Sequence, residues 1–270
     1  MIEQLVPDGL WEQIAPLLPP PKPRRHRYPG RRPIDDRAAL AGIVFVLKTG
    51  ITWTQLPTAL VGCSGVTCWR RLRDWTEAGV WPALHAQLLD QLRALGELDL
   101  DRCAVDGSHI RALKRGDHVG PSPVDRGRPG SKHHLIVEAG GIPLAVSLSG
   151  GNRNDITQLI PLVDAIPPIR GRRGRPRRRP GELFADRGYD HDVYRRQLRQ
   201  RGITPRIARR GVAHGSGLGK QRWVVERGFA WLHSFKRLRT RYERRADIHL
   251  GLLQLACALI CYRQLPVVLK

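Results

Sequence analysis

The chain has 270 residues, and 46 lysines and arginines against 24 aspartates and glutamates give it a formal net charge of +22. Hydrophobic residues make up 41% of the sequence, which is enough for a packed core and excludes a wholly disordered protein. A basic excess of this size indicates a polyanionic partner.

Neither export nor membrane insertion is indicated by the sequence. The N-terminal segment contains Glu3, Asp8 and Glu12 and lacks the apolar region of a signal peptide. The longest apolar stretches, Ala38–Leu47 and Leu250–Tyr262, fall short of the ~20 residues that cross a bilayer, so we expect buried helices and no membrane partner. The five cysteines show no CxxC spacing, which favours a reduced, cytoplasmic protein.

The first 96 residues are expected to be helical. Apolar spacing predicts a helix over 3–17, followed by an extended basic connector over Pro19–Pro33. Further helices are predicted from Asp35 to Gly50, from the N-cap Ser64 to Gly79, and over 80–95.

The third of these predicted helices carries Arg70, Arg71 and Arg73. An arginine-bearing helix after a short turn is typical of a helix-turn-helix DNA-binding unit. A plain helical bundle with surface arginines fits residues 1–96 equally well.

A different pattern begins near residue 97. Strands are predicted over 98–105, 133–138, 143–149, 182–185 and 204–207, and helices over 155–166, 191–201, 221–239 and 247–265. Strands first, and then helices and strands in alternation, predict an α/β domain with a mixed sheet over residues 97–270.

The positive charge is concentrated in this second part, since residues 1–100 carry a net charge of +2 and residues 101–270 carry +20. Seven arginines lie within Arg170–Arg179, among glycines and a proline that disfavour regular structure. We expect a mobile basic loop there, able to contact phosphates.

Three carboxylates lie where structure alone does not require them. Asp106 is predicted to follow the end of one strand, and Asp186 follows another. Glu226 lies on a predicted helix whose polar face also carries Arg222, His233 and Arg237.

Each carboxylate taken singly has an ordinary structural explanation, as a turn residue or as a helix-surface ion pair. Together, in an arginine-rich domain, they match the needs of phosphoryl transfer on DNA. Hard divalent cations take oxygen ligands, and two ions held ~3.5–4 Å apart can stabilise the attacking and leaving oxygens of an in-line displacement.

At these residues the chain resembles the DDE transposases of bacterial insertion sequences, in the insertion-sequence-five family of the insertion-sequence-four-like superfamily. Val105–Ser108 matches the V-D-G-S segment of that family, Ala185–Tyr189 its A-D-x-G-Y segment, and Arg222–Phe229 its R-x-x-x-E-R-x-F segment. Shorter similar stretches are Trp53–Pro57, Gly79–Trp81, Gly151–Asp155 and Arg241–Tyr242. Gly219 and His233 depart from the superfamily signature, which has tyrosine and a basic residue at those positions.

The resemblance implies a ribonuclease H-like catalytic domain in which Asp106, Asp186 and Glu226 are the catalytic residues. They would bind two Mg²⁺ ions, with Mn²⁺ as an alternative. The implied activity is that of a transposase which binds the terminal inverted repeats of its element, cleaves there, and joins the released end to target DNA. The implied assembly is a homodimer on double-stranded DNA, associated with the nucleoid.

We expect phosphate contacts from basic side chains of both parts: Arg222, Arg227, His233, Lys236 and Arg237 in the catalytic domain, and Arg70, Arg71 and Arg73 in the N-terminal domain. Two alternatives remain at this point. One is a DNA-binding protein without catalysis, such as a decayed transposase. The other is a ribonuclease H-like nuclease that cleaves without joining.

Overall fold

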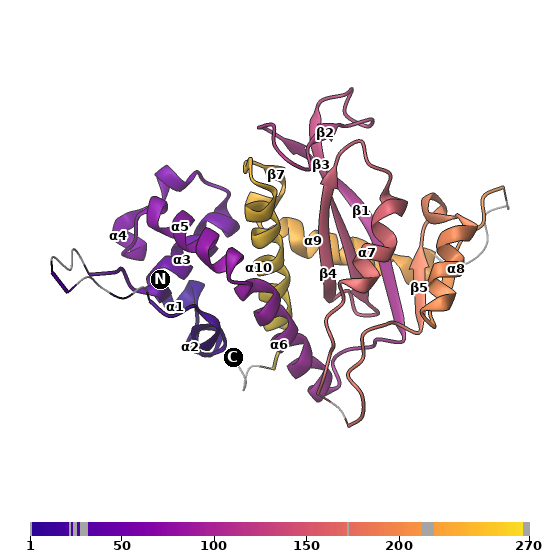
Figure 1. Cartoon of the computed structure of the whole chain (residues 1–270), viewed down its shortest axis with the longest axis horizontal. Coiled ribbons are helices and arrows are strands. Elements are labelled where there is room, and N and C mark those ends of the chain that lie inside the picture. The colour runs from indigo at the N-terminus through magenta and orange to yellow at the C-terminus, as the bar shows by residue number, and fades with distance from the viewer. Residues whose placement is uncertain are drawn as a thin grey trace.

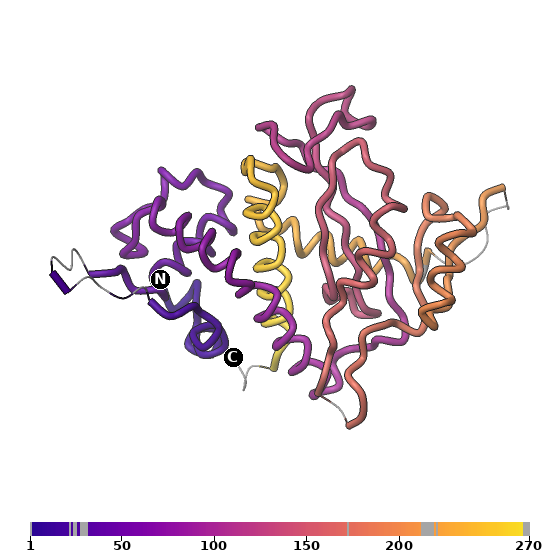
Figure 2. Tube along the Cα trace, viewed as in Figure 1, coloured from indigo at the N-terminus to yellow at the C-terminus, as the bar shows by residue number. Residues whose placement is uncertain are grey.

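The computed structural model describes residues 2–21, 23, 26–27, 32–171, 173–211 and 219–266. N-terminal helices form one side of the molecule and a mixed sheet the other, with the last helix, α10 (Ala246–Gln264), between them (Figure 1). Figure 2 shows the N-terminal helices on the same side of the sheet as α10. Of the predicted connector over Pro19–Pro33, residues 22, 24, 25 and 28–31 lie outside the described residues.

The prediction of one continuous helix over 3–17 is wrong. The chain forms α1 (Ile2–Leu5), α2 (Asp8–Ile14) and the 3-10 turn η1 (Ala15–Leu17). Pro7 precedes α2 with an extended backbone, and Pro16 lies in η1. Proline has no amide hydrogen, so neither Pro7 nor Pro16 can donate the hydrogen bond that would continue the helix before it.

The three other predicted N-terminal helices are confirmed as α3 (Asp36–Thr49), α5 (Gly65–Glu77) and α6 (Val80–Leu95). Two short elements that were not predicted, η2 (Trp53–Gln55) and α4 (Thr58–Val61), lie between α3 and α5. The Ala38 amide donates to the Asp35 carboxylate, and the Thr67 amide donates to the Ser64 hydroxyl. Gly50 ends α3 with a φ of 77°, which glycine adopts without strain.

The second part contains the predicted mixed sheet. Its described strands are β1 (Arg102–Ala112), β2 (Gly120–Pro121), β3 (Pro129–Glu138), β4 (Pro143–Gly150), β5 (Glu182–Ala185), β6 (Thr204–Ile207) and β7 (Thr240–Arg241). The central order is β4-β3-β1-β5-β6. β1, β3 and β4 pair antiparallel, and β5 and β6 continue from β1 in parallel. This is the ribonuclease H-like arrangement.

The predicted end of the first strand at residue 105 is wrong. β1 continues to Ala112, because it stays paired with β3 from Cys103 opposite Glu138 to Arg111 opposite Gly130. Asp106 therefore lies inside β1 and not after it. Long-range pairing extends the strand through the polar residues that suggested its end.

Helices cover both faces of the sheet (Figure 1). α9 (Gly219–Ser234) passes behind the strands and packs against β1, β3 and β5, whereas η3 (Asp155–Gln158) and α7 (Leu159–Asp164) lie in front. η4 (Arg187–Tyr189) and α8 (Asp192–Gln200) follow β5.

Two of the predicted helices end earlier than expected. The helix predicted over 155–166 is split between η3 and α7. The helix predicted over 221–239 ends at Ser234, and η5 (Lys236–Leu238) and β7 follow it. η5 packs against α3, so contacts distant in sequence override the helical pattern.

α10 is a core helix. By length and composition it could cross a membrane, but most of it is buried against α6 and β4. The apolar core extends from Val6 to Leu265, and all five cysteines are buried free thiols within the fold.

The basic loop, predicted to be mobile, is held by contacts near its ends. Ile169 and Arg177 pair as an antiparallel bridge, with amide-to-carbonyl distances of 2.8 and 2.9 Å. The Arg177 guanidinium lies 2.6 Å from the Asp101 carboxylate. Residue 172 lies outside the described part of this loop.

We predict that Gly228→Ala lowers the free energy of unfolding by about 1–3 kcal/mol, as overpacking does. A Cβ at residue 228 of α9 would lie 2.7 Å from Val137 Cγ1 and 3.0 Å from Leu135 Cδ2, both on β3. Urea unfolding measures the effect. Gly219→Ala is the matched control, since a Cβ there meets no atom of the described residues within 4 Å. Equal stability of the two variants would contradict the close packing of α9 on β3.

Candidate active site

The sheet register brings Asp106 and Asp186 to the same place. β1 and β5 run parallel, with Cys103 opposite Leu183 and Ala104 opposite Phe184. Asp106 and Asp186 each lie two residues beyond the last of these pairs. The predicted convergence of these two carboxylates is therefore built into the pairing of β1 with β5.

Asp106 is a largely buried acid with two hydrogen-bond donors. Its Oδ1 accepts from the Gly107 amide at 2.8 Å, and its Oδ2 lies 2.8 Å from the Arg222 guanidinium of α9. The pKa of Asp106 is raised to about 6, chiefly by burial, and the charges of Asp186 and Asp155 contribute to this increase. The Gly107 amide and Arg222 oppose this increase. The charged form of Asp106 is thus costly even with the Arg222 guanidinium beside it.

Asp155 is the site residue that the sequence analysis did not select. It opens η3 within the Gly151–Asp155 stretch, and a Cβ on Gly107 would lie 2.8 Å from its Oδ1. The ammonium of Lys132, a nearly buried β3 residue, lies 2.9 Å from the same oxygen. The carboxylate cluster of Asp106, Asp155 and Asp186 therefore has a third member, paired with lysine.

A buried tyrosine lies beside the carboxylate cluster. Tyr189 is 2% exposed, and its hydroxyl has no hydrogen-bond partner in the described structure. Burial, followed by the charges of Asp106, Asp155 and Asp186, raises the pKa of Tyr189. The hydroxyl stays protonated and is available as a donor or acceptor beside three anionic groups. Such a side chain fits a site that holds a polar or ionic group.

Glu226, the third predicted catalytic residue, is exposed on α9, one turn after Arg222. Arg222 contacts Asp106, so this part of α9 lies next to β1. Among the described residues, no three His, Cys, Asp or Glu side chains are arranged so that they could hold a metal ion. In this structure Asp106 is thus paired with Arg222 and is not arranged with Asp186 and Glu226 as a metal site.

Other basic side chains of α9 and η5 are partly available for phosphate contact. Lys236 is exposed. Arg227 stacks over the Trp223 ring, with its guanidinium carbon 4.2 Å from the ring centroid, and donates to the Gly140 carbonyl. Arg227 is therefore held in place on the surface of α9.

His233 and Arg237, also predicted to contact DNA, lie within the fold. His233 is stacked on Phe229, and burial lowers the pKa of its imidazole. Arg237 is 4% exposed and ion-paired with Glu243 at 2.7 Å. Arg237 was predicted to lie on the polar face of the helix, but α9 ends at Ser234, before this residue. In the structure Arg237 connects η5 to Glu243 through its ion pair.

The three arginines predicted to bind DNA in the N-terminal part lie on α5, and they differ in their partners. Arg70 is exposed. Arg71 lies 2.9 Å from the Asp36 carboxylate, and Arg73 lies 2.6 Å from that of Asp74. Arg70 is therefore the most available of the three for an external anion.

The chain is similar to two solved structures and to two known sequences. A Mos1 strand transfer complex and a pre-cleavage Mos1 transpososome align with 91% and 90% of this chain and with 83% and 81% of theirs. The sequence identities are 11% and 12%, and the TM-scores 0.33 and 0.27. The chain is also similar to two Burkholderia cepacia proteins of the element IS402.

The first of these relatives is described as "Putative transposase for insertion sequence element IS402" and is 64% identical over 54% of this chain and 70% of its own length. The second is an uncharacterized 16.2 kDa protein of IS402, 58% identical over 46% of this chain and 84% of its own length. The family model "Transposase DDE domain" matches residues 97–261, and "Putative transposase of IS4/5 family" matches residues 6–85. The chain therefore belongs to the DDE transposases of the IS4/5 family.

Proposed function

We propose that this transposase binds the terminal inverted repeats of its element and carries out both DNA cleavage and strand transfer. In the first step water attacks a phosphodiester at the element end and releases a 3′-hydroxyl. In the second step that hydroxyl attacks a phosphodiester of target DNA, and a 3′-hydroxyl of the target leaves. The carboxylate cluster beside a basic helix is the observation that carries the proposal.

We assign the cation site to Asp106, Asp186 and Glu226, and add Asp155 as a neighbouring carboxylate. The donor set suits Mg²⁺ or Mn²⁺, since both prefer oxygen ligands. The partnerless hydroxyl of Tyr189 supports a fit to an ionic or hydrated group. Two divalent ions bound there would stabilise the negative charge of the transition state.

Arg222 is the residue that must move for this site to act. Its guanidinium occupies the side of Asp106 that faces α9, with both side chains about a quarter exposed. A DNA phosphate offers Arg222 another anion and would release Asp106 for a cation. Arg222 thus exchanges one anionic partner for another when substrate binds.

The remaining parts of the proposal concern assembly. We propose three phosphate-binding surfaces: the exposed basic residues of α5, those of α9 with η5, and those of the Arg170–Arg179 loop. The family models match on either side of residues 86–96, which supports domains of 1–96 and 97–270. Joining two element ends in one complex favours a homodimer working on DNA of the nucleoid.

We expect Asp106→Asn, Asp186→Asn and Glu226→Gln each to abolish cleavage and joining, because each removes an anionic oxygen ligand. Binding of the inverted-repeat DNA should remain within a few fold of wild type. Gel assays with Mg²⁺ or Mn²⁺ measure both steps. Asp125→Asn, at an exposed loop pair with Arg128, is the matched control and keeps activity.

Full activity in any one of these variants would remove that residue from the site. Cleavage by the wild-type protein without joining would replace the transposition mechanism with that of a nuclease.

We expect Asp106→Asn to stabilise the metal-free protein at neutral pH. The folded-state pKa of Asp106 is raised from 3.8 to about 6, so above pH 6 the folded protein carries a costly charge. The gain is on the order of 1–3 kcal/mol at pH 7.5, and it disappears as the pH falls below ~4, where the wild-type acid is protonated in both states. Urea unfolding in EDTA from pH 4 to 8 measures it. A pH-independent difference would contradict the raised pKa.

We expect Arg222→Gln to bind Mn²⁺ about two- to fivefold more tightly than wild type when DNA is absent. The substitution removes a partly exposed cation that competes for Asp106, and such pairs contribute roughly 0–1 kcal/mol. Calorimetry at pH 8 measures the affinity. Arg227→Gln is the control, since Arg227 contacts Trp223 and the Gly140 carbonyl. Unchanged or weaker Mn²⁺ binding in Arg222→Gln would disprove the exchange.

A further inference from the structure

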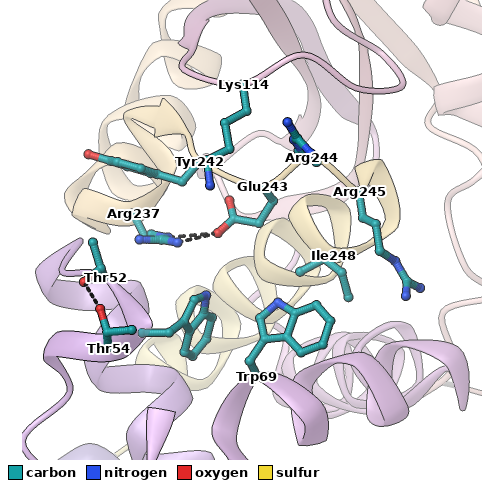
Figure 3. Close-up of a pocket in the computed structure, with 11 residues that line it drawn as sticks. Thr52, Thr54, Trp69, Lys114, Arg237, Tyr242, Glu243, Arg244, Arg245 and Ile248 are labelled. Carbon is teal, nitrogen blue, oxygen red and sulfur yellow. Dashed lines mark hydrogen bonds and ion pairs between the residues drawn. The ribbon is translucent and has the colours of Figure 1, made fainter. Parts of the chain in front are cut away.

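A pocket at the junction of the helical and catalytic parts is not used by the proposed chemistry. Its volume is about 380 Å³ (Figure 3). Trp53 of η2 and Trp69 of α5 line it from the N-terminal side, and Tyr242, which follows β7, lines it from the catalytic side. Trp53–Pro57 and Arg241–Tyr242 are two of the short stretches that the sequence analysis noted without a role.

The interior of the pocket is aromatic and internally neutralised. The Arg237 guanidinium carbon lies 4.4 Å from the Tyr242 ring centroid and 5.8 Å from that of Trp53. Glu243 accepts from the same guanidinium at 2.7 and 3.0 Å, and the Ile51 carbonyl at 2.9 Å. The Tyr242 and Trp53 rings therefore lie beside a fixed ion pair, and the charge of Arg237 is balanced by Glu243.

Cations without an anionic partner also line the pocket. Arg245 is paired with Glu77 and Asp247. Lys114 and Arg244, by contrast, line the same pocket and form no ion pair with a described residue (Figure 3). The pocket thus combines aromatic walls with two free positive charges.

This combination is complementary to a nucleotide. Every base has a flat face that stacks on aromatic side chains, and the attached phosphate pairs with lysine or arginine. The bases of an intact duplex do not offer these faces, since they are stacked on one another. A pocket of this size also falls within the range of sites for small molecules, about 300–1,000 Å³.

We propose that this pocket binds one unpaired nucleotide of the DNA substrate, with its base on the Trp53, Trp69 and Tyr242 rings and its phosphate beside Lys114 and Arg244. This inference rests on the proposed function, since it requires bound DNA. Because the walls come from both parts of the chain, the bound nucleotide would contact the N-terminal and the catalytic part at once.

The test compares two inverted-repeat duplexes that differ by one unpaired thymidine, in calorimetric or fluorescence-anisotropy titrations. We expect the wild-type protein to bind the bulged duplex about tenfold more tightly. Trp53→Ala and Trp69→Ala should remove the preference for the bulged duplex and keep the affinity for the paired duplex. Trp69→Phe should retain most of the preference for the bulged duplex. Trp223→Ala is the matched control, since Trp223 is an exposed tryptophan of α9 outside the pocket, and it should keep the tenfold ratio.

Crosslinking locates the base independently of affinity. A 5-iodouracil at the unpaired position should crosslink, on irradiation, to Trp53, Trp69 or Tyr242, as identified by mass spectrometry. Equal affinity for both duplexes, or crosslinks confined to residues outside the pocket, would overturn the inference and leave DNA binding in place. Failure to bind either duplex would instead contradict the proposed function.

Discussion

Burial of the Asp106 carboxylate beside two further carboxylates is the constraint that the surrounding structure has to balance. Burial is the main cause of the raised pKa of Asp106, and the charges of Asp186 and Asp155 add to it. The fold offsets this with positive groups and donors. Lys132 neutralises Asp155, Arg222 neutralises Asp106, and the Gly188 amide donates to Asp186 at 2.8 Å.

These compensating groups differ in how firmly they are held. Lys132 is almost fully buried and also donates to the Arg153 carbonyl, so it is a permanent part of the site. The Arg222 side chain is more exposed than that of Lys132, and it lies on α9 one turn before the exposed Glu226. Lys132 is therefore a fixed cation of the site, whereas Arg222 is more accessible to solvent.

The sequence was sufficient to predict what depends on local signals. The capped helix from Ser64 and the position of Asp186 at the end of β5 follow from caps, turns and strand patterns. Asp155 was missed because an aspartate that opens a helix has an ordinary role at the positive end of the helix dipole. Only the packing of η3 against Gly107 shows that it lies beside Asp106.

Arg237 could not be placed from its sequence for a related reason. Helical periodicity put it on the polar face with Arg222 and Glu226, and no proline or glycine marks an end at Ser234. Packing of η5 against α3 ends the helix, and the Ile51 carbonyl accepts from Arg237 across the two parts of the chain. Long-range contacts decide its environment.

The buried partners of Arg237 connect the pocket lined by Trp53, Trp69 and Tyr242 to strand β3. His249 Nδ1 donates to Glu243, so its Nε2 must accept from His133 Nε2, at 2.9 Å. Burial lowers the pKa of both histidines, which keeps them neutral in this chain of bonds. On β3, His133 lies between Lys132 and His134, and the side chains of both reach Asp155.

Breaking the pair of Arg237 and Glu243 would leave a carboxylate buried and incompletely paired, which is costly inside a protein. That cost opposes any motion that separates η5 from the start of α10. A ligand in the pocket would therefore act on a rigid connection whose other end is the strand that supports the carboxylate cluster. The pocket is therefore joined to β3 by hydrogen bonds from Glu243 through His249 to His133, and the β3 backbone continues from His133 to Lys132 beside the carboxylate cluster.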